Sequence, residues 1–206
     1  MRLSKTAYYA DFAIHAAVVA VLLVLAALGP GWPERLHWVA AFLAGAVGWT
    51  LIEYLLHSFV LHGDSALASI FAPMHAVHHD SPRAYVGTPT WVSQAVFWLV
   101  IFLPTWACGA SLNVASGATA GVIAGFLWYG VVHHTIHYRR PRLLMSWLST
   151  TARRHMYHHY STQAGNFGVT IALWDYLFGT VIAERARAAA SRRPTARSPA
   201  RVPPAT

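Results

Sequence analysis

The 206-residue chain is 56% hydrophobic and only 11% charged, whereas soluble domains carry about 25% charged residues. This composition argues against a water-soluble globular protein. A single cysteine, Cys108, excludes an internal disulfide, a zinc module built on cysteines and an iron–sulfur cluster. Basic residues outnumber acidic ones by 15 to 7, and because no nucleic-acid-binding fold accompanies this excess, we attribute it to membrane topology and exclude a nucleic-acid partner.

Long apolar segments predict membrane-spanning helices, because about 20 apolar residues suffice to cross a bilayer. The second of these segments carries one acid, Glu53, near its end. Residues 84–138 contain no Asp, Glu, Lys or Arg, which leaves room for two spans joined by a turn in the small-residue stretch 109–117. We therefore predict an all-α integral membrane protein with four transmembrane helices arranged as two hairpins. The predicted spans are residues 12–32, 36–56, 88–108 and 114–134.

The distribution of basic residues predicts the orientation of these spans. Fourteen of the 15 lie on one side of a four-span arrangement, and only Arg35 lies on the other. Short cytoplasmic loops are enriched in Lys and Arg, so both termini are predicted in the cytoplasm. The dominance of arginine over lysine favours a bacterial inner membrane. Residues 1–184 form the predicted membrane domain, and residues 185–206 a disordered basic tail.

Eleven of the 13 histidines lie in two windows on the predicted cytoplasmic side, in residues 57–83 and 133–184, and ten of them, all except His134, follow a repeated spacing. Each window has a widely spaced pair followed by a His-x-x-His-His triad, whose rings share one helix face. His57 and His62 are about 140° apart on an α-helix, so we predict that one comes from a frayed or unwound helix end, which Gly63 directly afterwards fits. The ten are His57, His62, His75, His78, His79, His133, His137, His155, His158 and His159.

Imidazole is a good and neutral ligand for iron, zinc, copper and nickel. Ten imidazoles can surround two divalent ions, so we predict that the ten histidines bind two metals. Glu53 precedes His57 by one helical turn and is predicted to accept the N–H of that ring and fix its tautomer. Asp80 and Asp175 are candidates for the same supporting role. The other three histidines, His15, His37 and His134, are predicted to be ordinary polar side chains.

The motifs in this order resemble those of the fatty acid hydroxylase and sterol desaturase superfamily of integral-membrane di-iron oxygenases. Within it, the protein most closely resembles the fatty acid 2-hydroxylase branch. The resemblance covers residues 49 to 180. The matching segments are residues 49–63, 75–79, 129–137, 155–160, 166–170 and 174–180.

This resemblance implies four membrane helices with a cytosolic helical cap that carries the histidine motifs, and it makes residues 1–184 a hydroxylase domain. It also implies two irons, with zinc as an alternative occupant in isolated protein, and O2 as co-substrate. No catalytic side chain is expected beyond the metal centre. A lipid from the bilayer would be the substrate, hydroxylated at one C–H bond of its acyl tail. Eukaryotic 2-hydroxylases carry a fused haem domain that we do not find before the first span. A separate cytochrome b5-like or ferredoxin-like electron donor is therefore expected.

Other functions remain open at this point. A carotenoid hydroxylase and a sterol desaturase or oxidase belong to the same superfamily. A divalent-metal transporter is the alternative from another class, but transporters place their ligands near the bilayer midplane, and these histidines cluster beyond the ends of the spans. A bis-histidine haem protein needs one axial pair per haem, which five-histidine groups exceed.

Overall fold

The computed structural model describes residues 2–29, 31–139 and 146–182, so the predicted tail 185–206 lies outside the described residues. Within them, regular structure is helical apart from one isolated bridge between Arg2 and Val86. The prediction of an all-α protein is confirmed. The helices are α1 (Lys5–Ala27), α2 (Gly31–Leu55), η1 (Leu56–Leu61), α3 (Ala66–Asp80), α4 (Thr90–Val96), η2 (Phe97–Phe102), α5 (Leu103–Ala107), α6 (Leu112–Tyr138), α7 (Ser146–Tyr160) and α8 (Leu173–Leu177).

Four helical stretches are long and apolar enough to cross a membrane, which confirms the predicted number of spans. They are Lys5–Ala27, Gly31–Leu61, Thr90–Ala107 and Leu112–Tyr138. The first ends earlier than predicted and the second begins earlier. Gly31 has a φ of 79°, which glycine adopts at little cost, and Pro33 fits the first turn of α2 because its missing N–H needs no partner there.

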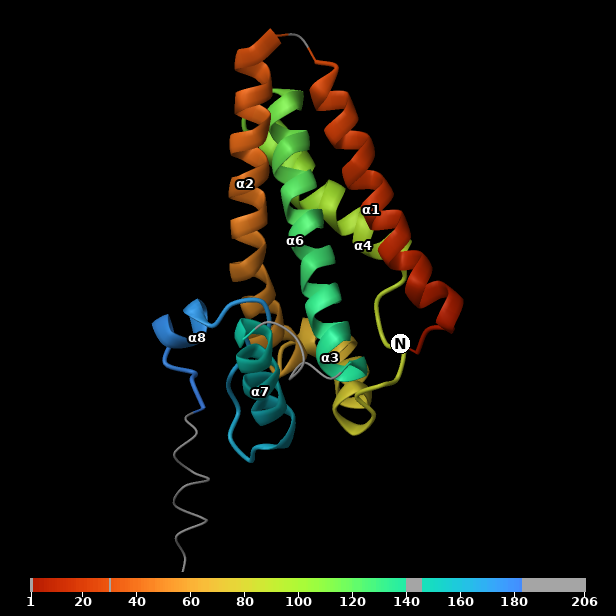
Figure 1. Cartoon of the computed structure of the whole chain (residues 1–206), viewed down its shortest axis with the longest axis vertical. Helices are drawn as coiled ribbons and strands as arrows, with labels where there is room; N and C mark the ends of the chain where they lie inside the picture. Colours follow the sequence, from red (N-terminus) through yellow and green to blue (C-terminus); the bar gives the residue numbers. More distant parts are fainter. Residues whose placement is uncertain (1, 30, 140–145, 183–206) are drawn as a thin grey trace, which may run out of the picture.

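Helix α6 is the centre of the bundle. Both α1 and α2 pack mainly against it rather than against each other, and Figure 1 shows α1 and α2 meeting at one end and diverging on either side of α6. The predicted pairing into two hairpins is therefore not confirmed. Helices α1 and α2 are consecutive in the sequence but diverge, because α6 offers each of them the better packing surface.

That surface is made of small residues. A Cβ atom on Gly121 would lie 2.0 Å from the Phe42 carbonyl oxygen, and one on Gly45 would lie 2.2 Å from the Ala118 carbonyl oxygen. Such close backbone approach is how membrane helices associate. The predicted turn over 109–117 is correspondingly too long: the Ser111 hydroxyl caps α6, and residues from Leu112 onward are helical.

The shorter helices α3, α7 and α8 lie at one end of the bundle, where α2 passes into η1 and α6 ends (Figure 1). Helix α3 packs against η1, α7 against α6, and α8 against α2. Each histidine window includes the end of a long helix and one of these short helices. The fold thus brings both windows to the same end of the molecule.

Candidate metal centre

A π-helical turn aligns the first two histidines. In η1 the backbone N–H of His62 donates to the carbonyl of His57, five residues earlier, over 3.2 Å. Residues five apart overlie one another in a π-helix, so both Nε2 atoms reach Nε2 of His75, at 3.1 and 2.9 Å. The predicted frayed or unwound end lies at His62, which follows η1 with a φ of −116° and a ψ of 4°, although its N–H keeps the hydrogen bond to His57. Gly63 does end the helix, since a Cβ there would lie 2.0 Å from the Phe59 carbonyl oxygen.

The structure brings all ten predicted ligand residues together in two clusters. Four nitrogens of the first cluster lie within 4.8 Å of one another, and His79 Nε2 joins them at 3.0 Å from His75 Nε2 and 3.2 Å from His158 Nε2. The five nitrogens of the second cluster also lie within 4.8 Å of one another. The first cluster is His57, His62, His75, His79 and His158, and the second is His78, His133, His137, His155 and His159.

Each cluster therefore combines both histidine windows. His158 comes from α7 and completes the first cluster, and His78 comes from α3 and completes the second. Sequence spacing groups each His-x-x-His-His triad as one unit, but the structure divides each triad between the two clusters.

The ring nitrogens fit metal ions. His75 Nε2 faces three other Nε2 atoms at 2.9 to 3.1 Å, although a single ring N–H has one hydrogen to donate. Ordinary hydrogen bonding therefore cannot account for this convergence. Two nitrogens bound at right angles to one metal at about 2.1 Å would lie about 3.0 Å apart. The second cluster has the same spacing, from 2.9 to 3.1 Å.

Backbone carbonyls fix the tautomer of two rings in the first cluster. His57 Nδ1 donates to the Phe167 carbonyl at 2.6 Å, and His158 Nδ1 donates to the Gly165 carbonyl at 2.9 Å. A proton on Nδ1 leaves Nε2 free to bind a metal. In the second cluster, Nδ1 of His155 and Nδ1 of His159 are buried and have no hydrogen-bond partner among the described residues.

Burial disfavours the protonated form of the histidine rings outside the spans. Burial lowers the pKa of His78 and of His158 to about 3, and that of His159 to about 2, because a protonated ring would lose its hydration. Burial lowers the pKa of His62 to about 4 and drives that of His75 far below its usual range, and neighbouring histidines add to both shifts. Neutral imidazole is the form that binds metals.

Glu53 supports the first cluster through the segment 165–170 and not by direct contact. Its Oε1 accepts the backbone N–H groups of Val169 and Thr170 at 2.6 and 2.9 Å, and its Oε2 accepts the Thr170 hydroxyl at 2.7 Å. The predicted hydrogen bond from His57 to Glu53 is not formed, because the His57 ring donates to the Phe167 carbonyl instead. A buried carboxylate needs several donors, and this segment supplies three.

Asp175 supports the same segment from the other side. It is fully buried, and it accepts the backbone N–H groups of Phe167 and Gly168 at 2.8 and 3.0 Å and the hydroxyl of Thr180 at 2.8 Å. Arg154 pairs with it at 3.3 Å. Asp175 makes no hydrogen bond to a histidine ring among the described residues, so its support is also indirect.

Asp80 and Asn166 are the two remaining polar residues of interest. In the described part of the protein, Asp80 makes no hydrogen bond to a ring, and its charge only opposes the lowering of the pKa of His79. Sequence reasoning missed Asn166 as a structural residue. Its positive φ of 54° suits asparagine, and its side-group amide accepts from Ile182 N at 3.0 Å and donates to Arg154 O at 3.2 Å.

The three excluded histidines lie outside both clusters, as predicted. His15 is bonded through Nδ1 to the Asp11 carbonyl at 2.7 Å. His134 Nδ1 lies 3.1 Å from the Tyr8 hydroxyl, and His37 is an exposed residue near Glu34.

A comparison with known families identifies this arrangement. The family model described as fatty acid hydroxylase matches residues 42–180, which include all ten histidines. The chain belongs to the fatty acid hydroxylase family. The solved structure of full-length scs7p, in which only the hydroxylase domain is visible, has the same fold, with a TM-score of 0.71 over 86% of this chain and 67% of that chain at 24% identity.

Curated relatives of the family are similar over the same region. The fatty acid 2-hydroxylase of Rattus norvegicus is 32% identical over 162 residues, which is 75% of this chain and 42% of the relative. A dihydroceramide fatty acyl 2-hydroxylase of Arabidopsis thaliana is 29% identical over 190 residues, which is 87% of this chain and 75% of the relative. The chain thus spans less than half the length of its mammalian relatives.

Proposed function

We propose that the family member described here hydroxylates a C–H bond of a lipid acyl chain, using O2 and electrons from a separate redox partner. The convergence of ten histidines in two clusters at one end of four apolar helices is the observation that carries this proposal. The names of the relatives favour a fatty acyl substrate. A sterol or carotenoid substrate has no comparable support.

The first cluster would hold one iron and the second cluster the other. When bound, the two irons supply the activation of dioxygen that oxidation of an unactivated C–H bond requires, which no amino-acid side group provides alone. The described residues supply the rest. Carbonyls of the segment 165–170 orient rings of the first cluster, burial keeps rings neutral, and the apolar helices give a lipid access from the bilayer.

The finer features of the proposal follow from the sequence. Both termini are placed in the cytoplasm of a bacterial cell, with the protein in the inner membrane. Residues 1–184 act as the hydroxylase domain, and a cytochrome b5-like or ferredoxin-like protein delivers electrons. Zinc competes with iron in isolated protein, because imidazole sites accept both.

Reconstitution tests this function directly. Protein loaded anaerobically with iron should contain two non-haem irons per chain and, with O2, reductant and acyl lipids, should form a 2-hydroxy acyl product detected by mass spectrometry. The His78→Ala variant is the inactive control, and His134→Ala the matched active one. If the protein oxidised carotenoids or sterols instead of acyl lipids, the proposed substrate class would be wrong. If it transported metal into liposomes without oxidising any lipid, the proposed enzyme activity would be wrong.

A further inference from the structure

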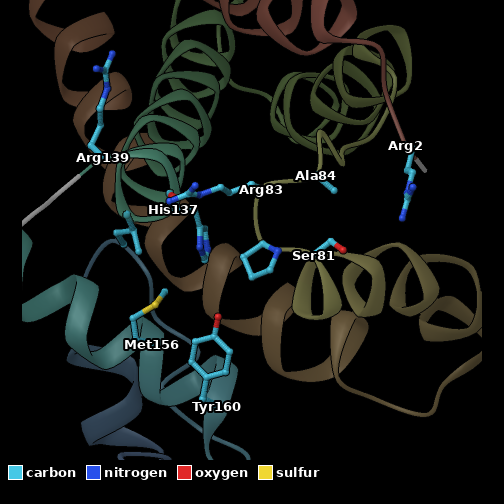
Figure 2. Close-up of a pocket in the computed structure, with 10 residues that line it drawn as sticks. Arg2, Ser81, Arg83, Ala84, His137, Arg139, Met156 and Tyr160 are labelled. Carbon is cyan, nitrogen blue, oxygen red and sulfur yellow. The ribbon is translucent and has the colours of Figure 1, made fainter.

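An open pocket of about 670 Å³ lies directly beside the second cluster. Figure 2 shows Arg83 reaching across it towards His137, with Met156 and Tyr160 rising from α7 on the opposite side. Its wall combines apolar residues, such as Ile136 and Met156, with arginines. A volume of this size is typical of small-ligand sites.

The pocket is cationic. Three arginines line it, Arg2, Arg83 and Arg139, and no Asp or Glu does. Among the described residues, none of these guanidinium groups forms an ion pair with an acid. Guanidinium groups bind carboxylate and phosphate through paired hydrogen bonds, so this wall favours an anion.

Arg83 is held in place at this wall. Its Nε donates to the carbonyl of His137 at 3.2 Å, and its own carbonyl accepts the Tyr138 hydroxyl. One edge of the guanidinium is thus attached to the end of α6 next to a predicted metal ligand. Nearby, the N-terminal segment is attached to the same loop, because Leu3 N donates to the Tyr85 carbonyl at 2.7 Å and Arg2 forms the bridge with Val86.

The position of the pocket indicates an amphiphile. Ile136, His137 and Tyr138 are the last residues of the fourth apolar span, so the pocket lies where the hydrocarbon region of a bilayer would give way to head groups. An anionic head group at Arg83 would leave its acyl tail beside apolar residues and the second cluster. A protein partner instead needs a broad surface, about 800 Å² on each side, whereas Arg83 here lines a hollow.

We propose that this pocket binds the carboxylate or phosphate head group of an acidic membrane amphiphile, with Arg83 as its main anchor. The inference rests on the proposed function and narrows its substrate class to anionic acyl lipids.

Binding without turnover tests the pocket. The full-length protein, loaded with zinc and held in phosphatidylcholine nanodiscs, is titrated with palmitate, palmitoyl lysophosphatidic acid, neutral monopalmitoylglycerol and inorganic phosphate, with empty nanodiscs as background. The Arg83→Gln variant should bind the two acidic amphiphiles about ten- to a hundredfold more weakly, the loss expected for a hydrogen bond to a charged group. Its affinity for the neutral lipid should not change.

Two further variants separate charge from folding. Arg35→Gln removes the same charge at the opposite end of α2, where the guanidinium donates to the Gly29 carbonyl, and should bind all probes like the wild type. Arg83→Lys keeps the charge without the paired donors and should retain affinity between wild type and Arg83→Gln. All variants should keep two zinc ions per protein molecule.

Other results overturn the proposal. If the wild type and Arg83→Gln bound acidic amphiphiles equally well, Arg83 would not be the anchor of the head group. If the protein bound inorganic phosphate tightly, the pocket would be a site for soluble anions. If Arg83→Gln lost cross-linking to an acidic ferredoxin but bound lipids as the wild type does, this face would be a docking surface for the electron donor. If acidic amphiphiles bind through Arg83 but iron-loaded protein oxidises none, the proposed function fails and the pocket stands.

Discussion

The two histidine clusters have the same donor chemistry but different support. In the first cluster, His57 and His158 are oriented by carbonyls of the segment 165–170, which Glu53 and Asp175 hold through its backbone N–H groups. In the second cluster, His155 and His159 have buried Nδ1 atoms without a partner among the described residues. Partners of the second ring nitrogen fix ring orientation, so the first cluster depends on a distant segment and the second on helix packing.

The largest expected effect comes from the two histidines that connect the clusters to the opposite windows. His158→Ala should remove metal from the first cluster and His78→Ala from the second, so each should reduce metal content from two ions to one per protein molecule. Activity should fall more than about a hundredfold, since loss of a supporting residue alone costs ten- to a hundredfold. Metal analysis and product formation measure both effects.

Double variants decide how these histidines are assigned. His158→Ala combined with His62→Ala affects one cluster twice and should still retain one metal, whereas His158→Ala combined with His78→Ala should retain none. A protein that loses both metals in the first combination would show that each window binds its own metal, against the geometry described above.

Sequence and structure agree best where a short-range pattern is enough. Apolar length predicted the four spans, and residue type predicted the ten histidines that come together. The sequence could not predict that His78 joins the cluster of the second window and His158 that of the first, because this depends on how α3 and α7 lie against the long helices. The π-helical turn was missed for a local reason, since a spacing of five looks misaligned only on an α-helix.

The acids show the same limit. Glu53 was identified because a lone acid in an apolar span is costly and needs a role, but its true partners lie 116 and 117 residues away in the sequence. The turn assigned to residues 109–117 is shorter than predicted, because small residues serve close helix packing as well as turns. Long-range contacts therefore decided what each feature does.

Asp175→Asn should have the next largest effect. The change removes a fully buried charge that two backbone N–H groups, Thr180 and Arg154 contact, leaving Arg154 without its acid. Breaking a buried pair costs about 3–5 kcal/mol, so thermal unfolding should occur at a clearly lower temperature. Metal should be lost preferentially from the first cluster. The exposed acid Asp64 provides the matched control, Asp64→Asn, and equal loss of both metals in Asp175→Asn would contradict the difference in support.

Glu53→Gln should give a smaller and more selective effect. Glutamine keeps the shape, and its carbonyl oxygen can accept the N–H groups of Val169 and Thr170. Its NH2 group then faces the Thr170 hydroxyl in place of a carboxylate oxygen, so hydrogen bonds to a charged acceptor, which contribute about 1.5–3 kcal/mol each, become weaker bonds to a neutral amide. The affinity of the first cluster for zinc should fall about ten- to a hundredfold, as competition with a chelator measures. Thr170→Val removes only the hydroxyl contact and should produce a smaller loss of zinc affinity. An equal or larger loss would show that Glu53 is not the main support of the segment 165–170.

The smallest effect is expected in the second cluster, where Tyr129 stacks on His133 with ring centroids 5.5 Å apart and an interplanar angle of 10°. Such a contact contributes about 0.5–1.5 kcal/mol, so Tyr129→Leu should weaken zinc binding there only about two- to tenfold. Tyr129→Phe keeps the ring and should behave like the wild type. Because the stacking partner of Tyr129 belongs to the second cluster alone, the first cluster should keep its affinity in both variants, and a matching loss there would mean that the clusters share one support.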